Sequence, residues 1–131
     1  MRKFEFDKAY EEIEINGKAY RVDFSDDKLK QYQDMLSEFY QEAQEIEQAD
    51  IEKMTPEEQT ALLEKQRQNM KTLTETMLGK GTFEELFELA GRSTWNYLKL
   101  IEFLAEIIRE RFEKFKEEQR KKYVKVSKKG K

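Results

Sequence analysis

The chain has 131 residues, of which 37% are hydrophobic and 40% are charged, and its formal net charge is −3. This length suits one domain, and the high charge predicts long solvated helical surfaces around a small core. The chain contains no histidine and no cysteine, which excludes disulfides, thiolate chemistry and the commonest general base and transition-metal ligand. We therefore expect no enzymatic activity, no metal and no cofactor. The start of the chain does not resemble a signal peptide and no membrane span is evident, so we expect a cytoplasmic location.

The first predicted element is a β-hairpin over about residues 10–24. Apolar and charged residues alternate on both sides of Asn16-Gly17, a dipeptide that suits a type I′ turn because both of its central residues need positive φ. A lone hairpin is not stable in water, so we expect it to pack on the helices, on a partner, or on both. Its free edges are a candidate surface for self-association. The apolar positions are Ile13, Ile15, Tyr20, Val22 and Phe24.

Two long helices are predicted over about residues 26–49 and 56–78. Ser25 or Asp26 precedes the first, and Thr55-Pro56-Glu57-Glu58 gives the second a capping box with proline at the first helical position. Large apolar residues are scarce between positions 41 and 76, so the pair forms either a protruding antiparallel arm or two ordinary surface helices. Heptad-like apolar positions in the second helix are Leu63, Met70, Leu73 and Met77.

A short helix over about residues 83–90 and a long one over about 94–123 complete the predicted domain, residues 1–123. Gly79 and Gly91 suit helix ends, and Thr82 with Glu85 predicts a second capping box. The long helix is apolar around most of its circumference between Trp95 and Ile108, which indicates the core helix. We expect Phe83, Phe87 and Trp95 in this core. The predicted fold class is mostly α (α+β), an N-terminal β-hairpin followed by about four helices.

The C-terminal residues 124–131 are predicted to be a basic, mobile tail. Residues 120–131 hold seven basic side chains and no acidic one, which leaves 18 basic against 28 acidic residues in the rest of the chain. Such a tail can contact nucleic acid, but an acidic body repels polyanions. The charge balance therefore favours a solubilising or partner-docking tail over nucleic-acid binding.

Three sequence segments resemble a known family when they are taken together. These are Ile-Glu-Ile-Asn-Gly-Lys in the hairpin, Tyr-Arg-Val-Asp-Phe-Ser-Asp-Asp at the strand-to-helix joint, and Leu-Gly-Lys-Gly-Thr-Phe before the short and long helices. Their arrangement is similar to that of tail assembly chaperones of long-tailed bacteriophages and prophages of Gram-positive bacteria. The resemblance covers most of the chain apart from residues 41–76.

This resemblance implies a non-enzymatic protein that coats the tape-measure protein and brings tail-tube subunits to it. It implies a place in the host cell cytoplasm and absence from the mature virion, and the chain resembles the short form that many such phages make beside a longer, frameshifted form. Alternatives are a helical adaptor that dimerises through its arm and a small nucleic-acid-associated protein that uses its tail.

Candidate partner-binding residues come from the apolar face of the hairpin and from the second long helix. Packing of the same residues against the chain's own helices remains an alternative for each of them. The candidates are Ile13, Ile15, Tyr20, Val22, Leu63, Met70, Leu73 and Met77.

Overall fold

A computed structural model describes the backbone of residues 1–129 and the side chains of residues 1–122. It confirms the predicted class, because an N-terminal antiparallel hairpin is followed by four α-helices, of which the last is long. In chain order the elements are β1 (Tyr10–Ile15), β2 (Lys18–Asp23), α1 (Asp26–Gln48), the short 3-10 helix η1 (Ile51–Lys53), α2 (Pro56–Leu78), α3 (Thr82–Leu89) and α4 (Thr94–Lys129).

The hairpin forms as its sequence predicts. Asn16 and Gly17 both have positive φ, 48° and 84°, and Ile15 pairs with Lys18 across the two-residue turn. Ile13 and Tyr20 lie opposite each other and are buried, while charged side chains occupy the outer face. Val22 is fully buried. The hairpin therefore packs on the chain's own helices.

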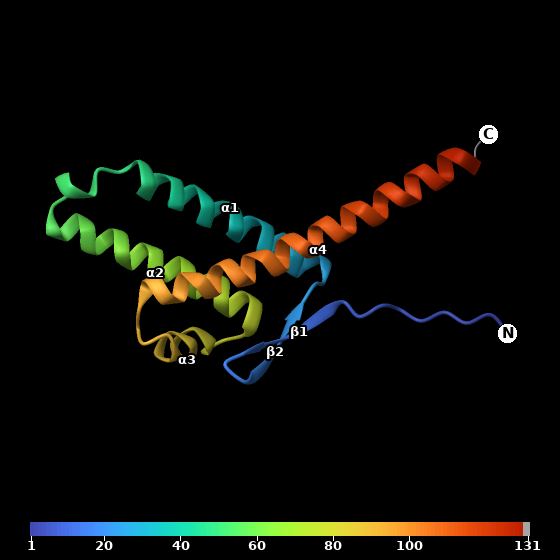
Figure 1. The fold of residues 1–131 in the computed structure, drawn as a ribbon, viewed down its shortest axis with the longest axis horizontal. Helices are drawn as coiled ribbons and strands as arrows, with labels where there is room; N and C mark the ends of the chain where they lie inside the picture. Colours follow the sequence, from blue (N-terminus) through green and yellow to red (C-terminus); the bar gives the residue numbers. More distant parts are fainter. Residues whose placement is uncertain (130–131) are drawn as a thin grey trace.

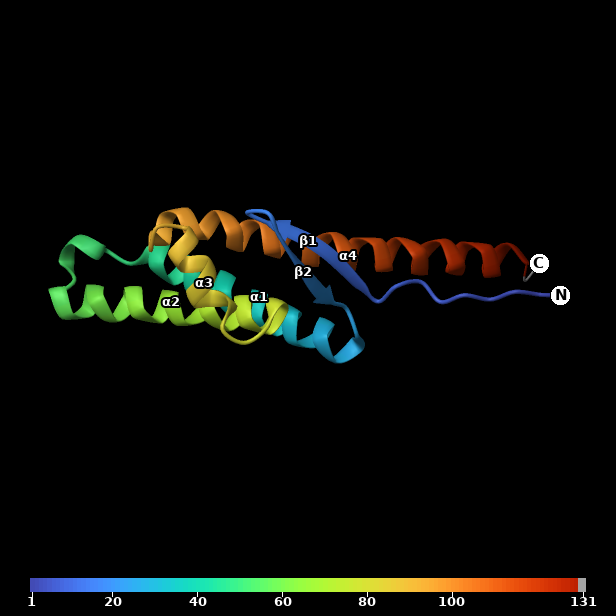
Figure 2. The same cartoon turned by 90° about the horizontal axis from the view of Figure 1, so that it is seen from below.

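The long helices form two layers, with α4 packed against the pair α1 and α2, and the hairpin and α3 lie on one side of these layers (Figure 1). In Figure 1, α1 and α2 run side by side to one end of the molecule, while α4 passes the pair and continues towards the other end. Figure 2 shows α3 and the hairpin on one side of these layers. The core lies where all of these elements meet, and α4 contributes six of its buried side chains: Tyr97, Ile101, Leu104, Ala105, Ile107 and Ile108.

An aromatic cluster joins α3 to α4 in the centre of this core. The rings of Phe83 and Phe87 stack with centroids 5.2 Å apart, and Tyr97 meets them edge-on at 5.1 and 5.7 Å. The Tyr97 hydroxyl shares a 2.7 Å hydrogen bond with the buried hydroxyl of Thr74 on α2. Since buried hydroxyls need a partner, this bond lets α2 and α4 approach without an unsatisfied polar group.

The far halves of α1 and α2 form a protruding arm. No residue between positions 41 and 69 is buried, and only a narrow seam, which includes Ile46 and Leu62, is partly covered. Lys65 pairs with Glu42 across the two helices at 3.3 Å. Thr55 caps α2 by accepting a hydrogen bond from the Glu58 N–H at 3.1 Å, as the sequence predicts. Of the two arrangements that the sequence left open, the structure shows the antiparallel arm.

Three local predictions are wrong, and the first two concern Trp95 and Thr82. Trp95 is 79% exposed, because Tyr97 and Ile101, one helical turn apart, point inwards and a residue two positions before Tyr97 points away. Thr82 does not cap α3, since Gly81 is the N-cap and the Thr82 hydroxyl donates to the Gly79 carbonyl at 2.6 Å.

The third correction concerns the C-terminus. α4 does not end at Tyr123 but continues to Lys129, through most of the expected tail. No proline or glycine precedes Gly130 in this segment, so no residue there breaks the helix. The last two positions of the expected tail lie outside the described residues.

Candidate functional site

Among the described residues, no group of three or more acidic side chains is placed to hold a metal ion. None of the described helices combines the length and apolar character that a membrane span requires. The distinctive surface features are instead apolar side chains left uncovered on a highly charged protein. Three of them, Leu89, Trp95 and Phe103, lie at the end of α3 and on the first half of α4.

A cleft of about 270 Å³, the hairpin groove, lies between the end of β1, α3 and the first half of α4. Its apolar lining includes Ile15, Leu86, Leu89 and Leu100. The ion pair between Lys18 and Glu85, 2.8 Å long, ties the hairpin to α3 at this groove. Both partners are about half exposed, so this pair sets the orientation of the hairpin more than it adds stability.

An exposed ridge runs from the end of α3 onto the first half of α4. Leu89, Trp95 and Phe103 are 54%, 79% and 45% exposed. Lys99 lines the hairpin groove and is four residues from both Trp95 and Phe103, so these side chains share one face of the helix. Leu89 belongs to both the ridge and the hairpin groove, and Lys99 places Trp95 and Phe103 on the face of α4 that borders the groove. The ridge and the hairpin groove are together called the apolar surface.

The turn between α3 and α4 holds this surface in a defined shape. The Arg92 N–H donates to the Phe87 carbonyl at 2.8 Å, and the Asn96 side chain donates to the Ala90 carbonyl at 3.1 Å. Gly91 and Arg92 both have positive φ, 74° and 53°. A hydrogen-bonded turn next to Trp95 reduces the conformational entropy that a partner would have to remove on binding.

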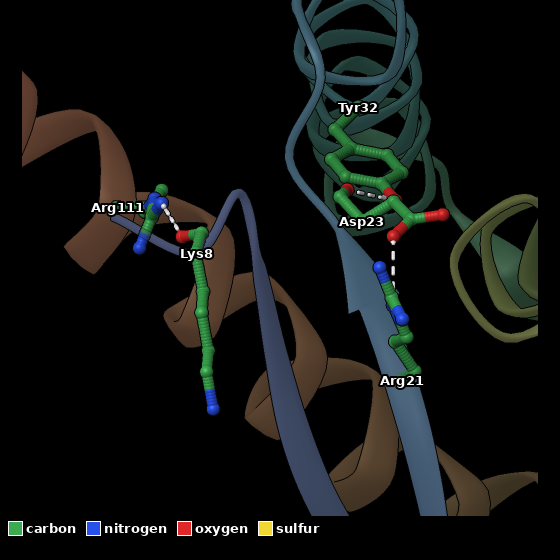
Figure 3. Close-up of polar contacts among 5 residues, drawn as sticks. All are labelled: Lys8, Arg21, Asp23, Tyr32 and Arg111. Carbon is green, nitrogen blue, oxygen red and sulfur yellow. Dashed lines mark hydrogen bonds and ion pairs between the residues drawn. The ribbon is translucent and has the colours of Figure 1, made fainter. Parts of the chain in front are cut away.

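Polar contacts at the opposite end of the hairpin clamp it between α1 and α4 (Figure 3). The Tyr32 hydroxyl of α1 donates to the Asp23 carbonyl at 2.7 Å, and Arg21 pairs with the Asp23 carboxylate at 3.2 Å. Arg111 of α4 donates to the Lys8 carbonyl at 3.1 Å. The hairpin is thus held by the helices at both ends, and the end of β1 forms one wall of the hairpin groove.

The structure places most of the predicted partner-binding residues in the core. Only two of the eight remain accessible: Ile15 is partly buried and lines the hairpin groove, and Leu63 is 56% exposed on the arm. The others are covered by the chain's own elements, which is the alternative stated for them above. These buried residues are Ile13, Tyr20, Val22, Met70, Leu73 and Met77.

Sequence reasoning missed the residues that form the apolar surface. Leu89 carries no signal of its own, Leu100 and Phe103 count only as part of the apolar stretch between Trp95 and Ile108, and Trp95 is predicted to lie in the core. One signal for them was present, because α4 is apolar over more of its circumference between positions 95 and 108 than a single packed face needs. The apolar residues of α4 that exceed one packed face are the ones that the structure leaves exposed.

Burial of Tyr32 makes the protein's stability sensitive to alkaline pH. Loss of solvation, reinforced by Asp23, raises the pKa of Tyr32 to about 12. An unfolded tyrosine ionises near pH 10, so the unfolded state loses this proton first and the free energy of unfolding falls as pH rises from about 10 through 12.

We expect Tyr32→Phe to flatten this decline in part, because Tyr97, whose pKa burial also raises to about 12, contributes a decline over the same pH range. Urea unfolding of both proteins between pH 9 and pH 12 measures the difference. Identical slopes for parent and variant would contradict the assignment.

Comparisons with known proteins identify no family for this chain. No protein-family model matches the sequence, and no curated protein or solved structure was found to be similar to it.

Proposed function

We propose that this chain is a tail assembly chaperone, in its short form, which binds helical segments of a tape-measure protein and helps to recruit tail-tube subunits to it. The observation that carries the proposal is the apolar surface formed by the hairpin groove and the ridge of Leu89, Trp95 and Phe103. Three segments of the chain resemble such chaperones: the hairpin, the strand-to-helix joint and the segment before the short and long helices. This resemblance restricts the expected partner to a phage tail protein.

The apolar surface suits an amphipathic helix as its ligand. Apolar side chains of such a helix enter a groove between secondary-structure elements, and the polar face of the helix stays in water. Trp95 has the residue type and the exposure of a binding hot spot. A long helical partner would offer many similar segments, so weak contacts repeated along its length would keep its apolar stripes covered before assembly.

Co-expression tests the proposal. The chain is expressed with the product of the long gene found a short distance downstream, and the soluble fraction of that product is measured. We expect the chain to raise this fraction and Trp95→Ser with Leu89→Ser to abolish the rise. If the long product is equally soluble with and without the chain, the proposed function is wrong.

A matched control separates the ridge from the arm. Leu63→Ser changes a comparably exposed leucine on the part of α2 that belongs to the arm and does not line the hairpin groove. We expect this variant to behave like the parent in co-expression. A loss of solubilisation with Leu63→Ser, and none with the ridge variant, would move the docking surface to the arm.

A further inference from the structure

The first eight residues form a segment, here called the strap, that the rest of the protein leaves uncovered. Figures 1 and 2 show it as an extended chain that leaves the hairpin towards the same end of the molecule as the second half of α4. All eight residues are exposed, and Phe4 and Phe6 are 78% and 89% exposed. Their rings meet edge-on with centroids 4.8 Å apart. The strap therefore presents an aromatic pair to water, which is a common anchor in peptide recognition.

The strap is anchored beside a cleft on α4. Arg111 donates to the Lys8 carbonyl at 3.1 Å, and its guanidinium lies 4.8 Å from the centre of the Phe24 ring. The α4 cleft, about 450 Å³, lies between α4 and the start of α1, and its lining includes Phe24, Asp26, Leu29, Lys30, Arg111 and Phe115. Arg111 and Phe115 also line a second space of about 410 Å³, together with Asp7 and Lys8 of the strap. The strap thus leaves the body of the protein at the rim of the α4 cleft.

The α4 cleft leaves apolar side chains in contact with water. Phe115 at its rim is 57% exposed, while Leu29 and Phe112 are partly buried and pack against the core. The strap carries uncovered rings and the cleft carries an uncovered apolar wall. Contact between the two removes apolar area from water, which favours closure.

Charge complements this apolar match. The amino group of Met1 is followed by Arg2 and Lys3, so the tip of the strap carries three positive charges. Asp26 and Asp27 lie in the first turn of α1, and Asp26 lines the α4 cleft. None of these groups forms an ion pair with another described residue. Opposite charge therefore directs the tip towards the start of α1 and away from the basic end of α4.

The strap is long enough to enter the cleft while its anchor stays in place. Phe6 is two residues from Lys8 and Phe4 is four, which allows spans of at most about 7 and 14 Å. Phe115 lies one helical turn, about 6 Å, beyond Arg111. A backbone rotation between the strap and its anchor can therefore bring both rings to the cleft without breaking the bond between Arg111 and Lys8.

We propose that the strap closes over the α4 cleft of its own chain. Phe6 packs against Phe115 in the closed form. Phe4 enters the cleft beside Leu29, and the positive tip faces Asp26.

Closure is balanced between two opposing terms. A short tether gives the strap an effective concentration of about the millimolar range at the cleft, so a weak contact is enough. The conformational entropy of the strap opposes its ordering. Both forms are therefore populated, the strap adds little to the stability of the core, and a ligand that binds the strap or the cleft shifts the equilibrium. The inference uses neither the hairpin groove nor the ridge, and it is independent of the proposed function.

Disulfide trapping in the full chain tests closure, because the protein has no cysteine of its own. Lys3→Cys with Lys30→Cys, here called the cleft pair, places one thiol next to Phe4 and one in the lining of the α4 cleft. A disulfide requires Cα atoms within about 7 Å of each other. We expect mild oxidation of the dilute protein to link the two positions within one chain, as measured by mass spectrometry and non-reducing electrophoresis.

A matched pair of cysteines corrects for random encounter. Lys3→Cys with Gln31→Cys, here called the control pair, uses the next residue of α1, which is also exposed but does not line the α4 cleft. The chain between the two thiols differs by one residue, so the entropy of loop closure is nearly the same. We expect the cleft pair to form its disulfide several times faster than the control pair. Equal rates would overturn the proposal.

Removal of the rings tests what holds the strap. Phe4→Ser with Phe6→Ser, added to the cleft pair, should slow its oxidation to the rate of the control pair, whereas Leu63→Ser on the arm should leave the rate unchanged. All of these positions are exposed or lie in the strap, and circular dichroism verifies the fold of each variant. Fast oxidation without the two rings would contradict the proposed contact. Dimers linked by disulfides as the main product would place the strap in the cleft of another copy and would also contradict it.

Discussion

Replacing Phe87 by alanine is expected to lower the free energy of unfolding by about 3–5 kcal/mol. The Phe87 side chain is 1% exposed and contacts Phe83 and Tyr97 in the aromatic cluster that joins α3 to α4. Its removal leaves a cavity that three packed elements cannot easily close. Because cavity formation adds to the lost burial of the ring, this change should be among the most severe single truncations in the chain.

Urea unfolding measures the effect, and the matched control is Phe4→Ala. Phe4 is 78% exposed in the N-terminal segment, so its truncation should change the free energy of unfolding by about 0.5 kcal/mol or less. Equal effects at the two positions would mean that the aromatic cluster is not the centre of the core.

Val22→Asp is expected to cost about 3–5 kcal/mol, the range seen when a charge is left buried without a partner. Val22 is fully buried on the inner face of β2, where the hairpin packs on the helices. The variant asks whether the hairpin belongs to the cooperative core or opens separately. If the hairpin is part of the core, the whole unfolding transition shifts to lower urea.

Ala19→Asp provides the comparison on the same strand. Ala19 is exposed and pairs with Glu14 across the hairpin, so aspartate at this position meets a like charge in water and should cost about 1 kcal/mol or less, well below the cost at Val22. If Val22→Asp left the urea transition of the helices unchanged and only exposed the hairpin to hydrogen exchange, the hairpin would be a lid on a core that the helices complete without it.

The buried methionines of α2 show where sequence reasoning about surfaces reaches its limit. Met70, Leu73 and Met77 repeat at a spacing that is equally suitable for a partner helix and for the protein's own core. The structure covers all three, because the second half of α2 lies next to α3 and α4. Leu63 has the same spacing but lies on the arm, beyond the reach of those elements, and stays exposed.

Trp95 is the reverse case, a residue predicted to lie in the core that the structure leaves exposed. A tryptophan at the start of an apolar helix is a reasonable core residue, and α4 offers more apolar positions than it can bury. Tyr97 takes the inward direction because Thr74 provides a partner for its hydroxyl and the Phe83 and Phe87 rings surround it. No local pattern in α4 contains those partners, so the choice between Trp95 and Tyr97 depends on packing between helices.

The sequence by itself determined the elements whose causes lie within a few residues. Asn16-Gly17 sets the turn of the hairpin, alternation sets its buried face, and Thr55-Pro56 starts α2, because backbone φ and terminal N–H groups are satisfied locally. Tertiary structure alone decided which of the surplus apolar residues became core and which became surface. The hairpin groove combines segments that are distant in the chain, and the ridge depends on what the neighbouring elements leave uncovered. No local pattern encodes either outcome.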